Sequence, residues 1–219
     1  MSSIVDHWWA RPNPTHRETV LQSVLRYFSN TGRGINYNTP IPLSWSVEHA
    51  ADFARAWKHS SDPGSMISLA AHVMREVDYI RLVAKIARLV LVYTYDPRVE
   101  HAIEATERWA DGKLSLHTLK QANRDVLAAR HEAADNSPEA IAASAGYWLS
   151  GIPQDREQID VGGFSGRMVV GSVRDLAIIG PDFYPRFPNS AKKAEGKMAA
   201  IIRREFKPTL GQIVLASRR

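Results

Sequence analysis

The sequence contains no cysteine. A disulfide scaffold, a thiolate metal site and a catalytic cysteine are therefore excluded, and the absence favours a reducing, cytoplasmic environment. The most apolar window, Leu82–Tyr95, contains Lys85 and Arg88 and is shorter than the roughly 20 residues that a membrane-spanning helix needs. The N-terminal residues lack a basic segment followed by an apolar run, so we expect no secretory signal and no membrane partner.

Signatures of catalysis and cofactor binding are missing as well. The chain has no GxSxG motif and no phosphate-binding loop of the GxxxxGK[ST] type. His72 with Glu76, and His101 with Glu104, have the one-turn spacing of metal ligands, but neither pair has the third ligand that a zinc site requires. We therefore predict no catalytic residue, no metal and no cofactor, and expect that the protein is not an enzyme. In the alternative, an enzyme on a helical scaffold, the fold would gather scattered ionisable residues. These are His49, His59, His72, Glu76, Asp78 and His101.

The composition is that of a globular protein whose charge is unevenly distributed. Its 219 residues are enough for a substantial core, and 44% are hydrophobic against 23% charged. The net charge is +5. Residues 95–150 carry 6 Lys or Arg against 9 Asp or Glu, whereas residues 151–219 carry 12 against 7. An acidic middle segment is thus followed by a basic C-terminal segment.

Helix caps and helical periodicity agree best in the middle of the chain. Asp96 followed by proline opens a helix that Asp111 and Gly112 end. Ser115 caps a second helix through about Ala134, and Ser137 starts a third that ends near Gly151. This segment is expected to fold as consecutive antiparallel helices.

Three more helices are predicted before this segment. Thr15 begins a capping-box pattern that leads into a helix through Phe28, and Ser46 caps a helix through about Lys58. Apolar residues at helical spacing predict one long helix over Met66–Thr94. Its last turns are apolar all round, so we expect that end to lie centrally in the core.

Helix caps and helical periodicity are less regular after Gly151. Val161–Arg167 is rich in glycine and is expected to form a loop, and Met168–Ile179 fits either a helix or strands. Ser190 caps a last helix through about Phe206. We predict a mainly α-helical fold, a bundle of about six helices over residues 1–151 with a less regular basic C-terminal extension over 152–219. This extension consists of loops plus a helix at about 190–206 and packs on the bundle or stands apart.

One face of the helix after Asp96 is acidic. Its carboxylates recur at i, i+4, i+7 and i+11, and together we call them the acidic stripe: Glu100, Glu104, Glu107 and Asp111. Like charges at this spacing oppose helix formation by about a few tenths of a kcal/mol each, a cost that an opposing basic surface would relieve. We interpret the stripe as a partner-binding face. The alternatives are a solvated face beside Arg108 and Lys113, or one docked on the chain's own basic tail.

The C-terminal segment offers an alternative, nucleic-acid-binding or anion-binding surface. We call its candidate residues the basic set: Arg186, Lys192, Lys193, Lys197, Arg203, Arg204 and Lys207. Gly162, Gly163 and Gly166 before Arg167 resemble an anion-binding nest only faintly, and we favour a flexible interdomain turn instead.

A family resemblance is carried by the segment Tyr95–Trp148. Its residues in order are Asp96-Pro-Arg98, Ala102-Ile-Glu-Ala105, Trp109, Gly112 and Leu114-Ser115, followed by an alanine-rich helix. This run resembles the small helical immunity protein family of the Imm-5-like type. The chain departs from that family in its less alanine-rich later helices and its basic C-terminal region.

The resemblance implies a non-catalytic protein that binds and neutralises another protein, a toxin or effector, in bacterial or phage conflict. The family offers no catalytic residue to carry over. On this reading the acidic stripe is the natural contact surface, because many toxins of such systems are basic nucleases. The alternative function is association with nucleic acid through the basic set.

Overall fold

The computed structural model describes residues 57–154, 161–179, 190–209 and 212. The helix predicted at Thr15–Phe28 and most of the one predicted at Ser46–Lys58 lie outside these residues. No strand occurs in the described part, and the predicted mainly α-helical class is confirmed. The elements are α4 (Pro63–Val73), α5 (Glu76–Ala87), the 3₁₀ helix η1 (Arg88–Tyr93), α6 (Pro97–Ala110), α7 (Leu116–Glu132), α8 (Pro138–Gly151), the 3₁₀ helix η2 (Ile152–Gln154), α9 (Val161–Ile179) and α10 (Ser190–Glu205).

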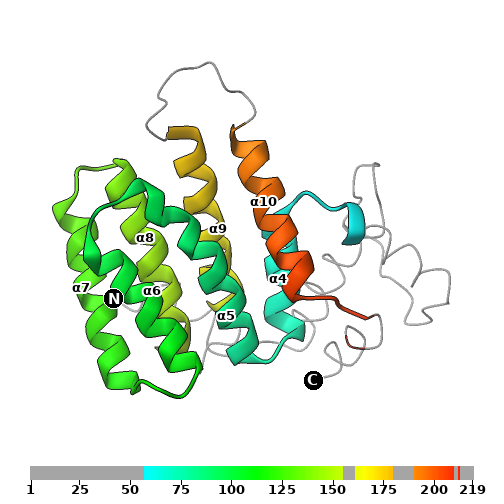
Figure 1. Ribbon diagram of the computed structural model, residues 1–219, viewed down its shortest axis with the longest axis horizontal. Helices are drawn as coiled ribbons and strands as arrows, with labels where there is room; N and C mark the ends of the chain where they lie inside the picture. Colours follow the sequence, from blue (N-terminus) through cyan, green and yellow to red (C-terminus); the bar gives the residue numbers. More distant parts are fainter. Residues whose placement is uncertain (1–56, 155–160, 180–189, 210–211, 213–219) are drawn as a thin grey trace, which may run out of the picture.

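The helices form a bundle in which α8 and α9 are central. Helices α6, α7 and α8 pack on one another on one side (Figure 1). On the other side α9 packs against α8 and α4, and α10 lies beside α9 and α4. Helix α5 connects the two sides, since it contacts α6 as well as α9 and α10. The site described below lies on α6 and its neighbours.

The predicted caps of the middle helices are confirmed. Asp96 Oδ1 accepts a hydrogen bond from the amide of Arg98 at 2.9 Å, and Ser115 and Ser137 cap α7 and α8 in the same manner. Gly112 adopts a positive φ of 71°, which ends α6 where the sequence predicts. Caps specify helix ends through local chemistry, and for this reason these boundaries are readable from sequence.

The single helix predicted over Met66–Thr94 is wrong. The segment folds as three elements. Met74 and Arg75 adopt extended backbone conformations between α4 and α5, and η1 follows α5 directly. No glycine or proline marks this break, and the apolar periodicity continues across it. The break lets α4 pack along α9 while α5 turns to meet α6.

The expected central position of the segment's apolar end is confirmed for one side of η1 and wrong for the other. Val90 is fully buried, but Val92 in η1 is 79% exposed and Tyr95 just beyond it is completely exposed. Leu89, Leu91 and Tyr93 pack against the core, but no described element covers the side of η1 that carries Val92. Apolar residues all round a short helix predict full burial only if neighbours cover every side.

The predicted loop at Val161–Arg167 is wrong as well, because α9 begins at Val161 and continues to Ile179. Its buried residues Val169, Val173 and Leu176 belong to the same core cluster as those of α4, α5 and α8. The last predicted helix is confirmed as α10, whose buried face also joins this cluster. The division at Gly151 into bundle and extension stays a prediction.

Candidate functional site

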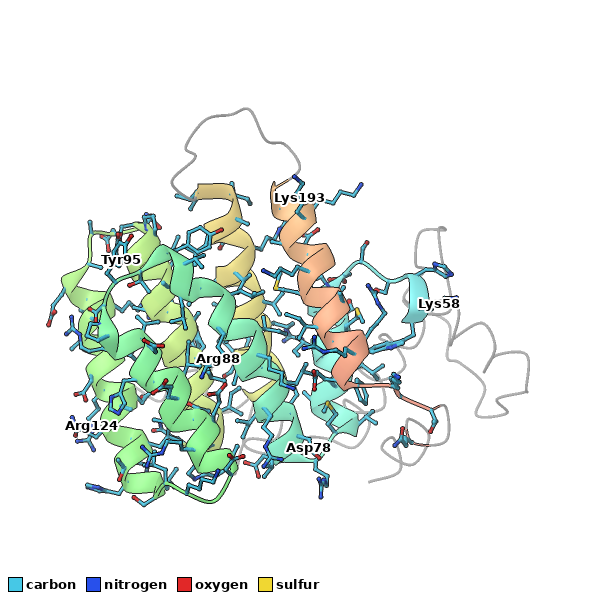
Figure 2. All side chains as sticks on the ribbon, viewed as in Figure 1. Lys58, Asp78, Arg88, Tyr95, Arg124 and Lys193 are labelled. Carbon is cyan, nitrogen blue, oxygen red and sulfur yellow. The ribbon has the colours of Figure 1, made fainter. Side chains whose placement is uncertain are left out.

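The acidic stripe lies along α6 at its border with α5 and η1. Arg88, the first residue of η1, lies between α5 and α6 (Figure 2). Its Nε and Nη2 atoms contact the two carboxylate oxygens of Glu107 at 2.8 and 2.6 Å. Such a two-point contact fixes the relative orientation of both side chains, besides attracting them.

The end of the stripe is held in a similar way. Arg81 of α5 donates to Asp111 Oδ1 at 2.9 Å and to the carbonyl oxygen of Ala110 at 3.2 Å. Lys113 lies 3.2 Å from the other carboxylate oxygen of Asp111. These contacts lower the pKa of Asp111, chiefly through the hydrogen bond from Arg81. Half of the stripe is therefore docked intramolecularly, on α5 and η1 rather than on the basic tail.

The other half of the stripe faces solvent. Glu100 and Glu104 are exposed, and neither forms an ion pair or hydrogen bond within the described residues. Both carboxylates still add to the field at Arg88, whose pKa is raised mainly by its hydrogen bond to Glu107. The structure thus presents Glu100 and Glu104 as unneutralised charges on a helix that arginines hold in place.

The residues of the basic set differ in their contacts and exposure. Lys192, Lys193 and Lys197 are exposed on α10, with Lys193 near its N-terminal end (Figure 2), and none has an ion pair among the described residues. Arg203 donates to the carbonyl oxygen of Ser60, which ties α10 to the segment before α4. The remaining members have separate positions. Arg204 contacts its neighbour Glu205 at 2.9 Å, Lys207 is exposed beyond the helix, and Arg186 lies outside the described residues.

A pocket that sequence reasoning missed lies at the other end of α6, where α7 ends and α8 begins. It encloses ≈ 210 Å³ and combines small apolar side chains with charged ones. The lining residues are Asp96, Arg98, Ala129, Glu132, Ala133, Glu139 and Ala143. Arg98 bridges Asp96 and Glu132, with Nη2–carboxylate distances of 2.7 Å to each. The Asp96-Pro-Arg98 run is the sequence signal for this pocket. The contact between Arg98 and Glu132 could not be predicted, because the two residues are 34 positions apart in the sequence.

Among the described residues, the remaining candidates do not come together, and His49 lies outside the described part of the chain. No group of three or more His, Cys, Asp or Glu among the described residues could hold a metal ion. His59 and His101 are both exposed and belong to different elements. Gly166, one of the three glycines of the anion-nest reading, lies inside α9. In the described residues, no helix is long and apolar enough to cross a membrane.

Comparison with known protein families gives a match. Residues 66–153 match the family model described as "Imm-5 like putative immunity protein". The chain matches no curated protein and no solved structure. The matched segment includes η1 and helices α5 to α8, and with them the acidic stripe and the pocket around Arg98. The resemblance predicted from Tyr95–Trp148 is therefore confirmed, since residues 66–153 of this chain are similar to the Imm-5-like family.

Proposed function

We propose that this chain is a non-enzymatic binding protein that neutralises another protein, a toxin or effector, in the cytoplasm of bacteria engaged in conflict with other bacteria or phages. The match of residues 66–153 to an immunity-type family supports a role of this class. The observation that carries the proposal is the division of the acidic stripe: Glu107 is held by arginine, while Glu104 one turn away is exposed.

This arrangement suits recognition of a basic protein surface. Charges across an interface steer encounter and select the partner, and they act best when their positions are fixed before binding. Arg88 and Arg81 hold α6 against α5, so Glu100 and Glu104 sit on a helix whose orientation is already set. Binding then relieves the like-charge repulsion along the helix and orders only two further side chains.

The test is affinity capture with the tagged full chain in cells of the native host, with nuclease treatment. We expect a protein to be retained after nuclease treatment, and Glu104→Lys to weaken its affinity by about tenfold or more. Close charge pairs at interfaces contribute roughly 1.5 kcal/mol or more, and 1.4 kcal/mol corresponds to tenfold. The matched control is Asp175→Lys on α9, which makes the same change in net charge at another exposed carboxylate. Circular dichroism should be unchanged in both variants.

Two results would count against the proposal. If Glu104→Lys and wild type bind the retained protein equally, the interface lies away from the stripe. If nothing is retained once nucleic acid has been digested, the chain is not a protein-binding immunity protein under these conditions.

The second candidate function is nucleic-acid association through the basic set. It is favoured by Lys192, Lys193 and Lys197, three exposed lysines on consecutive turns of α10 without ion pairs in the described residues. It is weakened by Arg203, which is used in an internal hydrogen bond. Capture of nucleic acid without nuclease treatment, lost on raising the salt concentration, would favour this candidate.

A further inference from the structure

Two large apolar side chains are left exposed next to the start of α6. Tyr95 is completely exposed and Val92 is 79% exposed, although the connection that carries them is otherwise packed. Figure 2 shows Tyr95 at the end of the bundle where α7 meets α8, which is also the end that contains the pocket around Arg98. Packing within the described residues does not account for this exposure. Exposed tyrosine is among the residue types that dominate binding energy at protein interfaces.

The backbone around Tyr95 is fixed on both sides. Thr94 is buried, and its hydroxyl oxygen accepts a hydrogen bond from the amide of Asp96 at 3.1 Å. Asp96 in turn caps α6 and pairs with Arg98. The aromatic ring is thus projected from a rigid turn, so docking it costs little backbone entropy.

The neighbouring pocket is negatively charged, whereas the chain as a whole is positively charged. Three of its lining residues are carboxylates and one is a guanidinium, which leaves two negative charges in a protein whose net charge is +5. Asp96 and Glu132 are engaged by Arg98, whereas Glu139 is exposed and has no ion pair among the described residues. Three alanine side chains provide apolar surface that fits the aliphatic stem of a lysine or arginine.

We propose that this end of the bundle, formed by Val92, Tyr95 and the Arg98 pocket, is the docking surface for a basic protein. Tyr95 inserts into an apolar hollow of that partner, and a lysine or arginine from the rim of the hollow enters the pocket beside Glu139. Glu100, one turn after Asp96 and the first member of the acidic stripe, continues the same negative field along α6. The carboxylates repel the phosphates of nucleic acid and of anionic lipid, so the surface selects a protein.

This inference rests on the proposed function and adds the anchor and the chemistry of the partner. The probe is the protein retained after nuclease treatment, purified and titrated against the full chain by calorimetry. Tyr95→Ala should weaken binding at least about tenfold, as removal of a central aromatic anchor does. The matched control is Ile178→Ala, which removes a 55% exposed apolar side chain from α9 and should leave affinity unchanged. Because Tyr95 is fully exposed, neither variant should alter helicity.

Glu139→Gln tests the pocket separately. It should weaken binding severalfold and make the affinity less dependent on salt concentration, since one charge contact is lost. The inference is overturned if Tyr95→Ala binds like wild type, if Tyr95→Ala and Ile178→Ala lose affinity equally, or if the retained protein is acidic. Loss of binding in Glu104→Lys with normal binding in Tyr95→Ala would overturn only this inference and keep the proposed function. Retention of no protein at all would overturn both.

Discussion

Gly166 of α9 packs closely against Tyr79 of α5 and Ile67 of α4. A Cβ atom built on it would lie 2.0 Å from the hydroxyl oxygen of Tyr79 and 3.3 Å from Cγ1 of Ile67. Tyr79 is only 3% exposed, and burial raises the pKa of its hydroxyl. A close-packed interior resists an added methyl group at this position. A glycine that the sequence assigned to a loop is therefore required for helix packing.

Gly166→Ala is expected to lower the free energy of unfolding by about 1–3 kcal/mol, because overpacking outweighs the roughly 1 kcal/mol that alanine contributes as a better helix former. Gly171→Ala, on the same helix with no atom within 4 Å of the added Cβ, should be neutral or stabilising. Urea unfolding measures both. In a Tyr79→Phe background the Gly166→Ala penalty should shrink, because the closest atom is gone. Equal stability of the two alanine variants would contradict the close approach.

At the scale of the element, the sequence predicts those helix ends that are set by residues close together in the chain. The caps at Asp96, Ser115 and Ser137 lie where expected, because each side chain accepts a hydrogen bond from an amide two or three residues later. The break at Met74 was missed, because it comes from packing on α9 and α6 and not from a breaker residue. The acidic stripe could be predicted as a helical face, but its arginine partners lie 19 and 30 residues away in sequence.

Asp96, the cap of α6, should also make the free energy of unfolding depend on pH in the acid range. The hydrogen bond from the Arg98 guanidinium is the main cause that lowers the pKa of Asp96. Because the folded pKa lies below the unfolded one, the carboxylate stabilises the fold at neutral pH, and this contribution is lost as the pH falls through the folded pKa, below about pH 4. Asp96→Asn keeps a capping oxygen without the charge. Its free energy of unfolding should fall less than that of wild type between about pH 7 and pH 3.

The control for this prediction is Asp175→Asn, whose carboxylate is exposed on α9 without an ion pair in the described residues. Its unfolding free energy should follow the wild-type pH dependence. Parallel curves for wild type and Asp96→Asn would mean that the Asp96–Arg98 pair contributes nothing to folding.

At the scale of the molecule, the described helices share one main core. Met198 and Ile202 of α10 belong to the same buried cluster as residues of α4, α5, α8 and α9. The rings of Trp57 and Phe206 meet edge to face at 5.4 Å, and Arg174 of α9 contacts Glu195 of α10 at 3.1 Å. A core of this kind argues that the basic C-terminal segment contributes to the stability of the helices that carry the acidic stripe.

Met198→Ala tests this coupling. The side chain is fully buried in α10, so its truncation should lower the free energy of unfolding by about 2–5 kcal/mol. If the molecule unfolds as a unit, the slowest-exchanging amides of α7 and α8 should lose protection by the same free energy, measured by hydrogen exchange and mass spectrometry. Lys197→Ala, on the exposed face of the same helix, should change neither quantity appreciably. Lost protection confined to α9 and α10 would instead favour a boundary near Gly151, and a partner could then bind the middle helices without the C-terminal segment.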